Sequence, residues 1–263
     1  FNAADIGSLV HDMLERCFKY AKFAKKKIAG MSEGELYSLV DEAVKESIIT
    51  DKNSILEESK KSKVQLEKIV RMTKLTMLVL AKQLEAGNFI PFDFERIFGE
   101  KDNLAALNID LKNNAKMYLR GKIDRVDICE DNDKTLVKII DYKTGNMKWE
   151  MDMPYYGRAL QLVIYLDAVM EQMAKEGREI LPAAFFYYHI DAPFLTRDEA
   201  KKENAFLKKL KPSGIVNTDL DIIKHLDKSI ETDSDVIPVS IKKDGSFSQY
   251  STVASTQRIN LLR

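Results

Sequence analysis

Several features that mark secreted, membrane-bound or nucleic-acid-coating proteins are scarce or absent in this sequence. Its 263 residues include two cysteines, Cys17 and Cys129. Two are too few for a disulfide framework, which indicates a reducing, cytoplasmic compartment. The best apolar run, Leu75 to Ala81, is broken by Thr76 and falls short of the ~18 residues of a membrane helix. Lysine plus arginine and aspartate plus glutamate number 41 each, so the zero net charge excludes a protein that coats nucleic acid by bulk charge.

The two ends of the sequence also lack signals. The first residues do not have the charged-then-apolar order of a signal peptide, and the chain opens on Phe1 rather than methionine. Residues 255–263 have the pattern of a helix that is cut before any stop signal. We therefore expect a piece of a longer protein. Its hydrophobic content of 45% and charged content of 31% predict a globular chain of one to two domains.

The pattern along the chain predicts helices first and a sheet afterwards. Helical periodicity covers residues 6–28, 33–47 and 55–86. Ser32 and Glu35 form a possible capping box, and Gly87-Asn88 ends the third helix. Alternating β-branched and aromatic residues predict strands in the ranges 89–98, 116–129, 135–143 and 183–190, with a helix at 155–176. More polar sequence then predicts helices near 197–210 and 219–231 and a short strand or hairpin in 237–250.

This order predicts one mixed α/β domain with a helical N-terminal flank. Residues 1–88 form the flank in this interpretation, residues 89–193 an α/β core, and residues 194–263 the C-terminal helices and hairpin.

The informative stretch is GKIDRVD at 121–127, followed by an acidic turn and KIIDYKTG at 138–145. Asp141 and Lys143 share one strand face because side chains alternate. If the turn is a tight hairpin centred on Asn132-Asp133, Asp124 lies directly opposite Asp141. Cross-strand neighbours have Cβ atoms ~4.5–5.5 Å apart, so two ionised carboxylates there need a proton or a cation between them. Mg²⁺ or Mn²⁺ suits such oxygen ligands.

The neighbouring side chains extend this candidate site. The Lys143 ammonium beside a metal can stabilise charge on a phosphorane or help to position and deprotonate an attacking water. Gln161 and Tyr165 are spaced i to i+4 and therefore share a helix face, where they can orient a phosphate or a nucleobase. The alternative is a hairpin that carries surface aspartates and a lysine, beside a solvated helix flank.

Together, GKIDRVD, IDYKTG and YYGRALQLVIYL at 155–166 resemble the RecB-like branch of the PD-(D/E)xK nucleases, and within it the C-terminal nuclease domains of the AddB type found in helicase–nucleases. The segment DIGSLVHDMLE at 5–15 is similar to the family's first motif. Phe185–Ile190 and Ile237–Gly245 also resemble these domains, whereas residues 30–87 carry no motif that aligns. The resemblance implies a restriction-endonuclease-like mixed sheet flanked by helices.

The resemblance also implies roles for individual residues. His11, Asp124 and Asp141 would hold the metal, Lys143 would be the catalytic lysine, and Gln161 with Tyr165 would support the site and the DNA. Position 123 is isoleucine where the superfamily name has proline, a change that is usual in this branch. AddB-type domains also hold a 4Fe–4S cluster on four cysteines. Cys17 and Cys129 match neither end where those cysteines lie, so we interpret them as a core thiol and a strand thiol and expect no cluster.

The function implied is that of a Mg²⁺- or Mn²⁺-dependent deoxyribonuclease acting on single-stranded DNA delivered by an AddA-type helicase partner and the rest of the parent chain. The implied process is double-strand break repair. The alternatives are a non-catalytic module that binds DNA or docks a partner protein, and a stand-alone CRISPR-associated RecB-like exonuclease. The basic segment from Arg16 to Lys27, with Lys19 and Lys22, is a candidate DNA path or a solvated lysine face. His189 and His225 are interpreted as a strand residue and a helix-surface residue.

Overall fold

A computed structural model describes residues 3–50, 60–98, 107–110, 116–119, 121–144, 160–174, 177, 179–193, 195–199, 201 and 204–262. It divides into two compact units. A helical unit is drawn from residues 1–86, 142–147 and 189–211, and a sheet unit from residues 87–141, 148–188 and 212–263. Within the described ranges, no helix is both long and apolar enough to cross a membrane.

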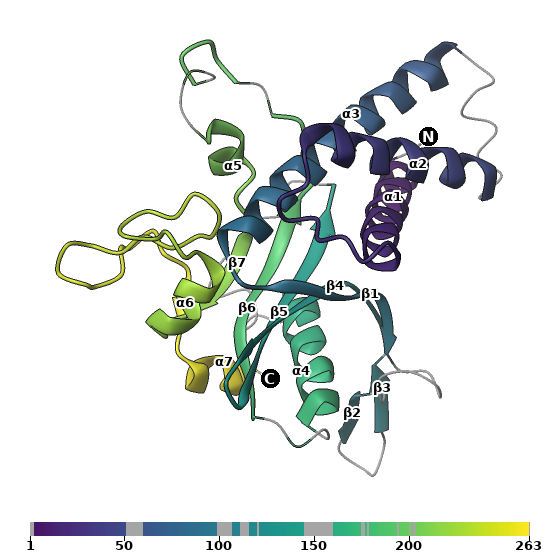
Figure 1. The fold of residues 1–263 in the computed structure, drawn as a ribbon. Coiled ribbons are helices and arrows are strands. Elements are labelled where there is room, and N and C mark those ends of the chain that lie inside the picture. The colour runs from purple at the N-terminus through teal and green to yellow at the C-terminus, as the bar shows by residue number, and fades with distance from the viewer. Residues whose placement is uncertain are drawn as a thin grey trace. The chain divides into compact units, whose positions relative to one another are not determined.

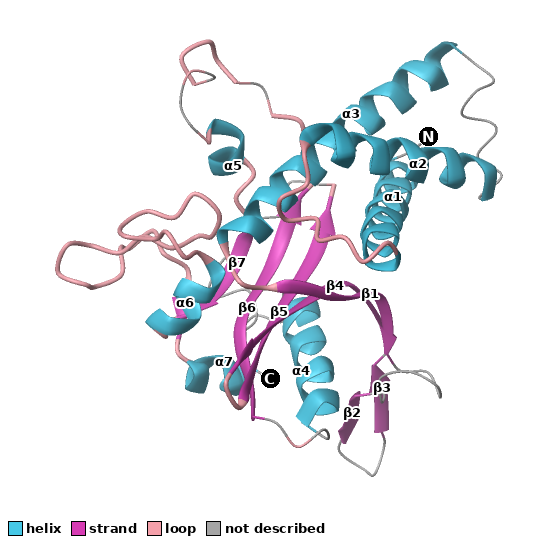
Figure 2. Ribbon diagram, in the orientation of Figure 1, coloured by secondary structure: helices cyan, strands magenta, loops and turns pink. Residues whose placement is uncertain are grey.

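The helical unit contains α1 (Ala3–Phe23), α2 (Glu33–Thr50), α3 (Lys60–Ala86) and the short α5 (Ala205–Lys209), which Figures 1 and 2 show as ribbons. Apolar residues at spacings of three and four on α1 turn inward, as the sequence predicts. The buried set on these helices includes Val10, Met13, Leu14, Cys17, Leu36, Val40, Met77 and Leu80. Burial raises the pKa of the Cys17 thiol to about 12, so Cys17 is confirmed as a core thiol.

The first helix ends earlier than the predicted residue 28. Lys25 has a φ of 53°, in the left-handed region that usually favours glycine. The Lys26 amide donates to the Ala21 carbonyl at 2.9 Å, and the Lys25 amide donates to the Lys22 carbonyl at 3.1 Å. These two bonds form a Schellman motif, which satisfies carbonyls at the helix end. The basic segment is therefore helical up to Phe23 and turns away after it.

The start of α2 confirms the predicted capping box. Ser32 Oγ accepts from the Glu35 amide at 3.3 Å, and the Glu35 carboxylate accepts from the Ser32 amide at 3.0 Å. Both orphan donors at the helix start are satisfied in this way. The predicted end of the third helix before Gly87 is also confirmed, and residues 55–59 of that prediction lie outside the described residues.

The main sheet has six strands in the order β1-β4-β5-β6-β7-β8. Their bounds are Ile90–Phe98, Gly121–Asp131, Lys134–Lys143, Glu179–His189, Ser213–Asn217 and Val253–Ala254. β2 (Leu107–Asp110) and β3 (Lys116–Leu119) pair separately in a second sheet. The prediction of one strand over 116–129 is therefore wrong, because its two halves belong to different sheets. The helices of this unit are α4 (Leu160–Ala174), α6 (Leu220–Leu226) and α7 (Thr256–Leu262).

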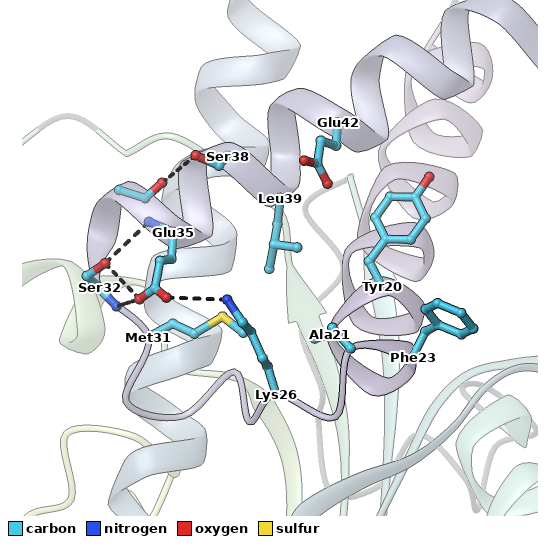
Figure 3. A pocket seen from close by; sticks show the side chains of 12 residues that line it. Tyr20, Ala21, Phe23, Lys26, Met31, Ser32, Glu35, Ser38, Leu39 and Glu42 are labelled. Atoms are coloured by element: carbon cyan, nitrogen blue, oxygen red, sulfur yellow. Dashed lines mark hydrogen bonds and ion pairs between the residues drawn. The ribbon is translucent and has the colours of Figure 1, made fainter.

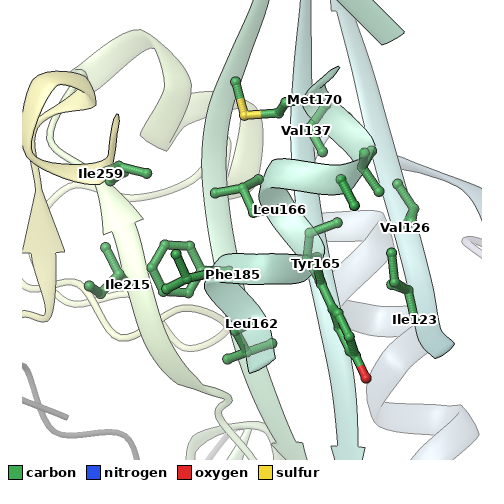
Figure 4. Packing of buried hydrophobic residues seen from close by; sticks show 14 of the residues in the cluster. Ile123, Val126, Val137, Leu162, Tyr165, Leu166, Met170, Phe185, Ile215 and Ile259 are labelled. Atoms are coloured by element: carbon green, nitrogen blue, oxygen red, sulfur yellow. The ribbon is translucent and has the colours of Figure 1, made fainter. Parts of the chain in front are cut away.

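The core of the sheet unit lies between α4 and the strands (Figure 4). Leu162, Leu166 and Val169 of α4 pack with Val126, Val137, Ile139, Phe185, Ile215 and Ile259. Each such side chain contributes roughly 1.5–3 kcal/mol on burial. This packing fixes the α4 helix against the strand pair β4–β5. The predicted mixed α/β fold is confirmed, although residues 155–159 of the predicted helix lie outside the described residues.

Two helix predictions for the C-terminal third need correction. The helix expected over 197–210 is reduced to α5, preceded by a turn in which the Glu199 carboxylate accepts from the Thr196 amide at 2.8 Å. The helix expected to reach residue 231 ends at Leu226. It ends there because the Asp227 carboxylate accepts from Ser229 and Ser234 instead of letting the helix continue. The predicted strand or hairpin in 237–250 is present as a short hairpin, with an antiparallel bridge between Ile241 and Phe247 and an amide of Lys242 that donates to the Ser246 carbonyl at 2.8 Å.

Candidate active site

The hairpin that carries the two aspartates has the predicted register. Pairing runs from Asp131↔Lys134 to Arg125↔Ile140, and the two turn residues are Asn132 and Asp133. Asn132 adopts a φ of 51°, the left-handed conformation that a two-residue hairpin turn requires. One pair further along the same register, Asp124 lies opposite Asp141. Both are buried, with exposed fractions of 6% and 2%.

A third carboxylate, which sequence reasoning missed, lies beside Asp124. β1 pairs with β4 so that Phe94 opposes Arg125 and Arg96 opposes Ile123, which puts Glu95 opposite Asp124. One carboxylate oxygen of Glu95 lies within 4.8 Å of one of Asp124. Glu95 has a φ of 50°, and non-glycine residues held in this region cluster at functional sites. It also forms an ion pair with Lys122.

The two α4 residues of the prediction contact each other. Gln161 Nε2 donates to the Tyr165 hydroxyl at 2.6 Å, which confirms that they share one face. Tyr165 is buried with the core cluster, so this face is not a solvated flank. Burial, with the negative charges of Asp141 and Asp124, raises the pKa of Tyr165. The phenol therefore stays neutral beside the carboxylates and keeps a proton that it can donate.

The remaining two residues of the predicted set belong to the helical unit. The His11 ring on α1 meets the Tyr142 ring edge to face, with centroids 5.8 Å apart. Four residues earlier on the same helix, a Cβ on Gly7 would lie 3.1 Å from Thr144 Oγ1. Lys143 lies between Tyr142 and Thr144 at the end of β5, and its carbonyl accepts from the Ile190 amide at 2.9 Å. The first motif thus packs against the residues that flank Lys143.

A buried charge cluster lies in the strands that carry the aspartates. Arg125 Nε donates to Asp127 Oδ1 at 2.7 Å, and its second guanidinium nitrogen donates to Oδ2 at 2.7 Å. Lys138 Nζ lies 2.9 Å from Asp127 Oδ2 and 4.9 Å from the centroid of the Phe89 ring. Burial opposes ionisation of Asp127, but the two cations outweigh it and hold its pKa below the usual value. Arg125 and Asp127 are therefore structural parts of the GKIDRVD motif.

The opposed carboxylates fit a hard divalent cation. Asp124 and Glu95 supply oxygen atoms within a few ångströms of each other, and Asp141 is the next opposed residue of the hairpin. Ionised carboxylates gathered on buried strands need a compensating positive charge. Carboxylate oxygens are the ligands that Mg²⁺ and Mn²⁺ prefer.

The other residues singled out in the sequence have varied environments. Lys19 forms an ion pair with Glu15 on α1, and Lys22 is exposed near the end of that helix. Cys129 lies buried in β4, which confirms it as a strand thiol. His225 lies on α6 and its side chain is partly exposed, as its interpretation as a structural helix-surface residue predicts. Its Nδ1 lies 3.0 Å from Asn88 Nδ2 and 3.5 Å from Cys129 Sγ, so it bridges α6 to two other segments of the sheet unit.

Comparison with known proteins agrees with this geometry. The family model described as PD-(D/E)XK nuclease superfamily matches residues 1–238. The chain is also similar to proteins that are named as the B subunits of ATP-dependent helicase/deoxyribonucleases. It is 34% identical over 269 residues to that of Thermoanaerobacter sp. strain X514, 36% over 264 residues to that of Clostridium tetani, and 31% over 271 residues to that of Clostridioides difficile.

These alignments cover 98–100% of this chain but only 23–24% of each relative. The chain therefore spans about a quarter of the length of the relatives it matches. The family match extends over the first motif, the aspartate hairpin and α4. The chain belongs to the PD-(D/E)XK nuclease superfamily.

Proposed function

We propose that this chain is the nuclease domain of an AddB-type helicase/deoxyribonuclease protein and that it hydrolyses DNA phosphodiester bonds with Mg²⁺ or Mn²⁺. The observation that carries the proposal is the opposition of Asp124 and Asp141 at the end of a buried hairpin, with Lys143 two residues further along. The match to the nuclease family over residues 1–238 supports it independently. Residues 1–88 supply the first motif and residues 89–193 the catalytic core.

The roles that we propose follow from the chemistry of each side chain. Asp124, Asp141 and His11 hold the metal, which when bound supplies Lewis-acid stabilisation of the phosphoryl charge. Lys143 donates to the phosphate oxygen on which negative charge develops. The neutral Tyr165 hydroxyl, oriented by Gln161, donates to the substrate or holds the carboxylates in place.

We further propose that the substrate is single-stranded DNA, cut as an exonuclease cuts, and that a helicase partner of the AddA type delivers it in the cytoplasm. The supporting fact is that the relatives are named as subunits of ATP-dependent helicase/deoxyribonucleases. The process served is then the preparation of double-strand breaks for recombinational repair.

The test measures cleavage of end-labelled single-stranded DNA in Mg²⁺. Asp141→Ala is expected to abolish cleavage while the circular dichroism spectrum stays unchanged. Asp133→Ala, in the exposed hairpin turn, is the matched control and should cut like the unmodified chain. Titration calorimetry with Mn²⁺ gives a second readout, since binding heat should depend on Asp124. Undiminished cleavage by the Asp141 variant contradicts the proposal, and the absence of Asp124-dependent heat identifies a non-catalytic module instead.

A further inference from the structure

The helical unit has a groove where α1 ends and α2 begins (Figure 3). Its volume is about 630 Å³. Tyr20 and Phe23 line the α1 side, Leu39 lies on α2, and Met31 closes the end near the connecting turn. We call this feature the α1–α2 groove. Gly34 adds room on the α2 side, since a Cβ there would meet no atom within 4 Å.

Phe23 is the accessible aromatic residue of the α1–α2 groove, whereas Tyr20 is half-buried and its hydroxyl oxygen is buried. Tyr20 and Phe23 are three residues apart and therefore lie on one side of α1. Phe23 is 91% exposed, the highest exposed fraction among the large hydrophobic residues that the structure describes. Covering an exposed aromatic ring with a flat apolar ligand removes apolar surface from water and so lowers the free energy of the complex. A nucleobase is such a ligand. Stacking of one base on an aromatic side chain contributes about 1–3 kcal/mol.

The charged residues next to Phe23 in the chain are positive. Lys22, Lys25, Lys26 and Lys27 are all exposed and flank Phe23 in the chain. Because of the Schellman motif at Lys25, Lys25–Lys27 lie outside the α1 helix. They still follow its last residue directly in the chain. Glu35 and Glu42 also line the groove, but Glu35 accepts hydrogen bonds from Ser32 and pairs with Lys26 at 3.6 Å. Lys26 is the lysine that lines the groove, and the exposed Lys22, Lys25 and Lys27 beside Phe23 add the positive charge that complements a polyanion.

We propose that the α1–α2 groove binds single-stranded DNA, with a base stacked on Phe23 beside Tyr20 and phosphates paired with Lys22 and Lys25–Lys27. The choice of DNA as the polyanion rests on the proposed function. An apolar peptide segment would also cover the rings, but it offers no negative charge to the four exposed lysines beside Phe23. Proteins that bind single-stranded DNA without sequence preference combine aromatic side chains that stack on bases with basic residues that contact the phosphates.

The test measures the affinity of the full chain for a fluorescent oligo-dT of about twelve nucleotides by anisotropy, in EDTA so that no cleavage occurs. Phe23→Ala is expected to weaken binding about tenfold, the equivalent of ~1.4 kcal/mol for one lost stack, with an unchanged salt dependence. Phe23→Trp should bind at least as well as the unmodified chain. Leu261→Ala removes a side chain that is 87% exposed elsewhere and is the matched control.

The lysines are tested separately through the salt dependence. Replacing Lys25 and Lys27 together by glutamine should weaken binding and lower the slope of log affinity against log salt by ~1.4, because each phosphate contact on a single strand contributes ~0.7. The same change at the exposed Lys224 and Lys243 should leave the slope unaltered.

Two outcomes overturn the inference. One is unchanged DNA affinity in both the Phe23→Ala and the double lysine variants. The other is unchanged DNA affinity of Phe23→Ala together with weakened association with the helicase partner, which would identify a protein-docking surface. The test is separable from that of the proposed function, because Asp141→Ala should lose cleavage and still bind oligo-dT in EDTA. Binding that depends on Phe23 in a chain that never cuts would refute the nuclease alone.

Discussion

The buried carboxylate of Asp127 makes a sharp stability prediction. Asp127→Asn keeps the shape of the side chain and one oxygen acceptor but removes its charge. Arg125 and Lys138 then remain buried without the anion that now lies 2.7–2.9 Å from their nitrogen atoms. Removing one partner of a buried ion pair costs about 3–5 kcal/mol, because the remaining charge is uncompensated.

This loss is large relative to the total stability of about 5–15 kcal/mol that domains possess. At about 2–4 °C per kcal/mol for a chain of this size, the unfolding midpoint should fall by roughly 6–20 °C. Thermal unfolding followed by circular dichroism measures the fall of the midpoint, and urea unfolding measures the loss of unfolding free energy. Asp198→Asn is the control, because Asp198 is 90% exposed in its pair with Lys201 and its loss should cost less than about 0.5 kcal/mol.

A cost below about 1 kcal/mol for Asp127→Asn would refute the reasoning, since it would mean that the two cations are solvated when Asp127 is neutral. The reasoning also predicts a rescue. Replacing Arg125, Asp127 and Lys138 together by apolar residues of similar volume should recover most of the lost stability, because no buried charge then remains.

Three further predictions concern pH, packing and the metal. The depressed pKa of Asp127 stabilises the fold above the unfolded value of ~3.9, so the stability difference between the unmodified chain and Asp127→Asn should be constant at neutral pH and shrink as acid unfolding proceeds below about pH 4. Gly87→Ala should lower the unfolding midpoint, because its Cβ would lie 2.6 Å from the His225 carbonyl oxygen, whereas Gly34→Ala should not. Glu95→Gln should weaken Mn²⁺ binding in calorimetry about 10–100-fold, the range for a residue that supports a metal site.

Each of these has a result that contradicts it. A stability difference that persists unchanged at about pH 2 would show that Asp127 is not the titrating group. Equal midpoints for the Gly87 and Gly34 variants would mean that the backbone at His225 gives way freely. Unaltered Mn²⁺ affinity of Glu95→Gln would leave Glu95 as the ion-pair partner of Lys122 and nothing more.

The aspartate hairpin was predictable because every determinant is local. A turn of two polar residues fixes the register, and alternation then decides the face of each side chain. Glu95 could not be found in this way. Its place opposite Asp124 depends on pairing between β1 and β4, whose facing residues are separated by a segment that includes a second sheet. The only available signal was an acid within a strand-like run.

Helix ends were the weakest part of the sequence interpretation. The Schellman motif after α1 uses Lys25 where a glycine is the usual signal, so the pattern of lysines suggested that the helix continues. α6 ends because the Asp227 side chain bonds to Ser229 and Ser234, a competition that helical periodicity does not reveal. The ionic role of Asp127 within GKIDRVD also depends on Lys138, which lies across the hairpin.

The two-residue turn at Asn132-Asp133 restricts where the chain tolerates insertions. Seven residue pairs separate this turn from the Asp124–Asp141 position, a distance of roughly 23 Å at ~3.3 Å per residue. One added residue in the turn has to be absorbed by a bulge or by a slipped register, and a slip would carry Asp141 to the opposite face of the sheet. A peptide tag is better placed at the exposed turn around Asp244 and Gly245, which a single bridge between Ile241 and Phe247 spans. The length of a remote, solvent-exposed turn thus helps to decide whether Asp124 and Asp141 oppose each other.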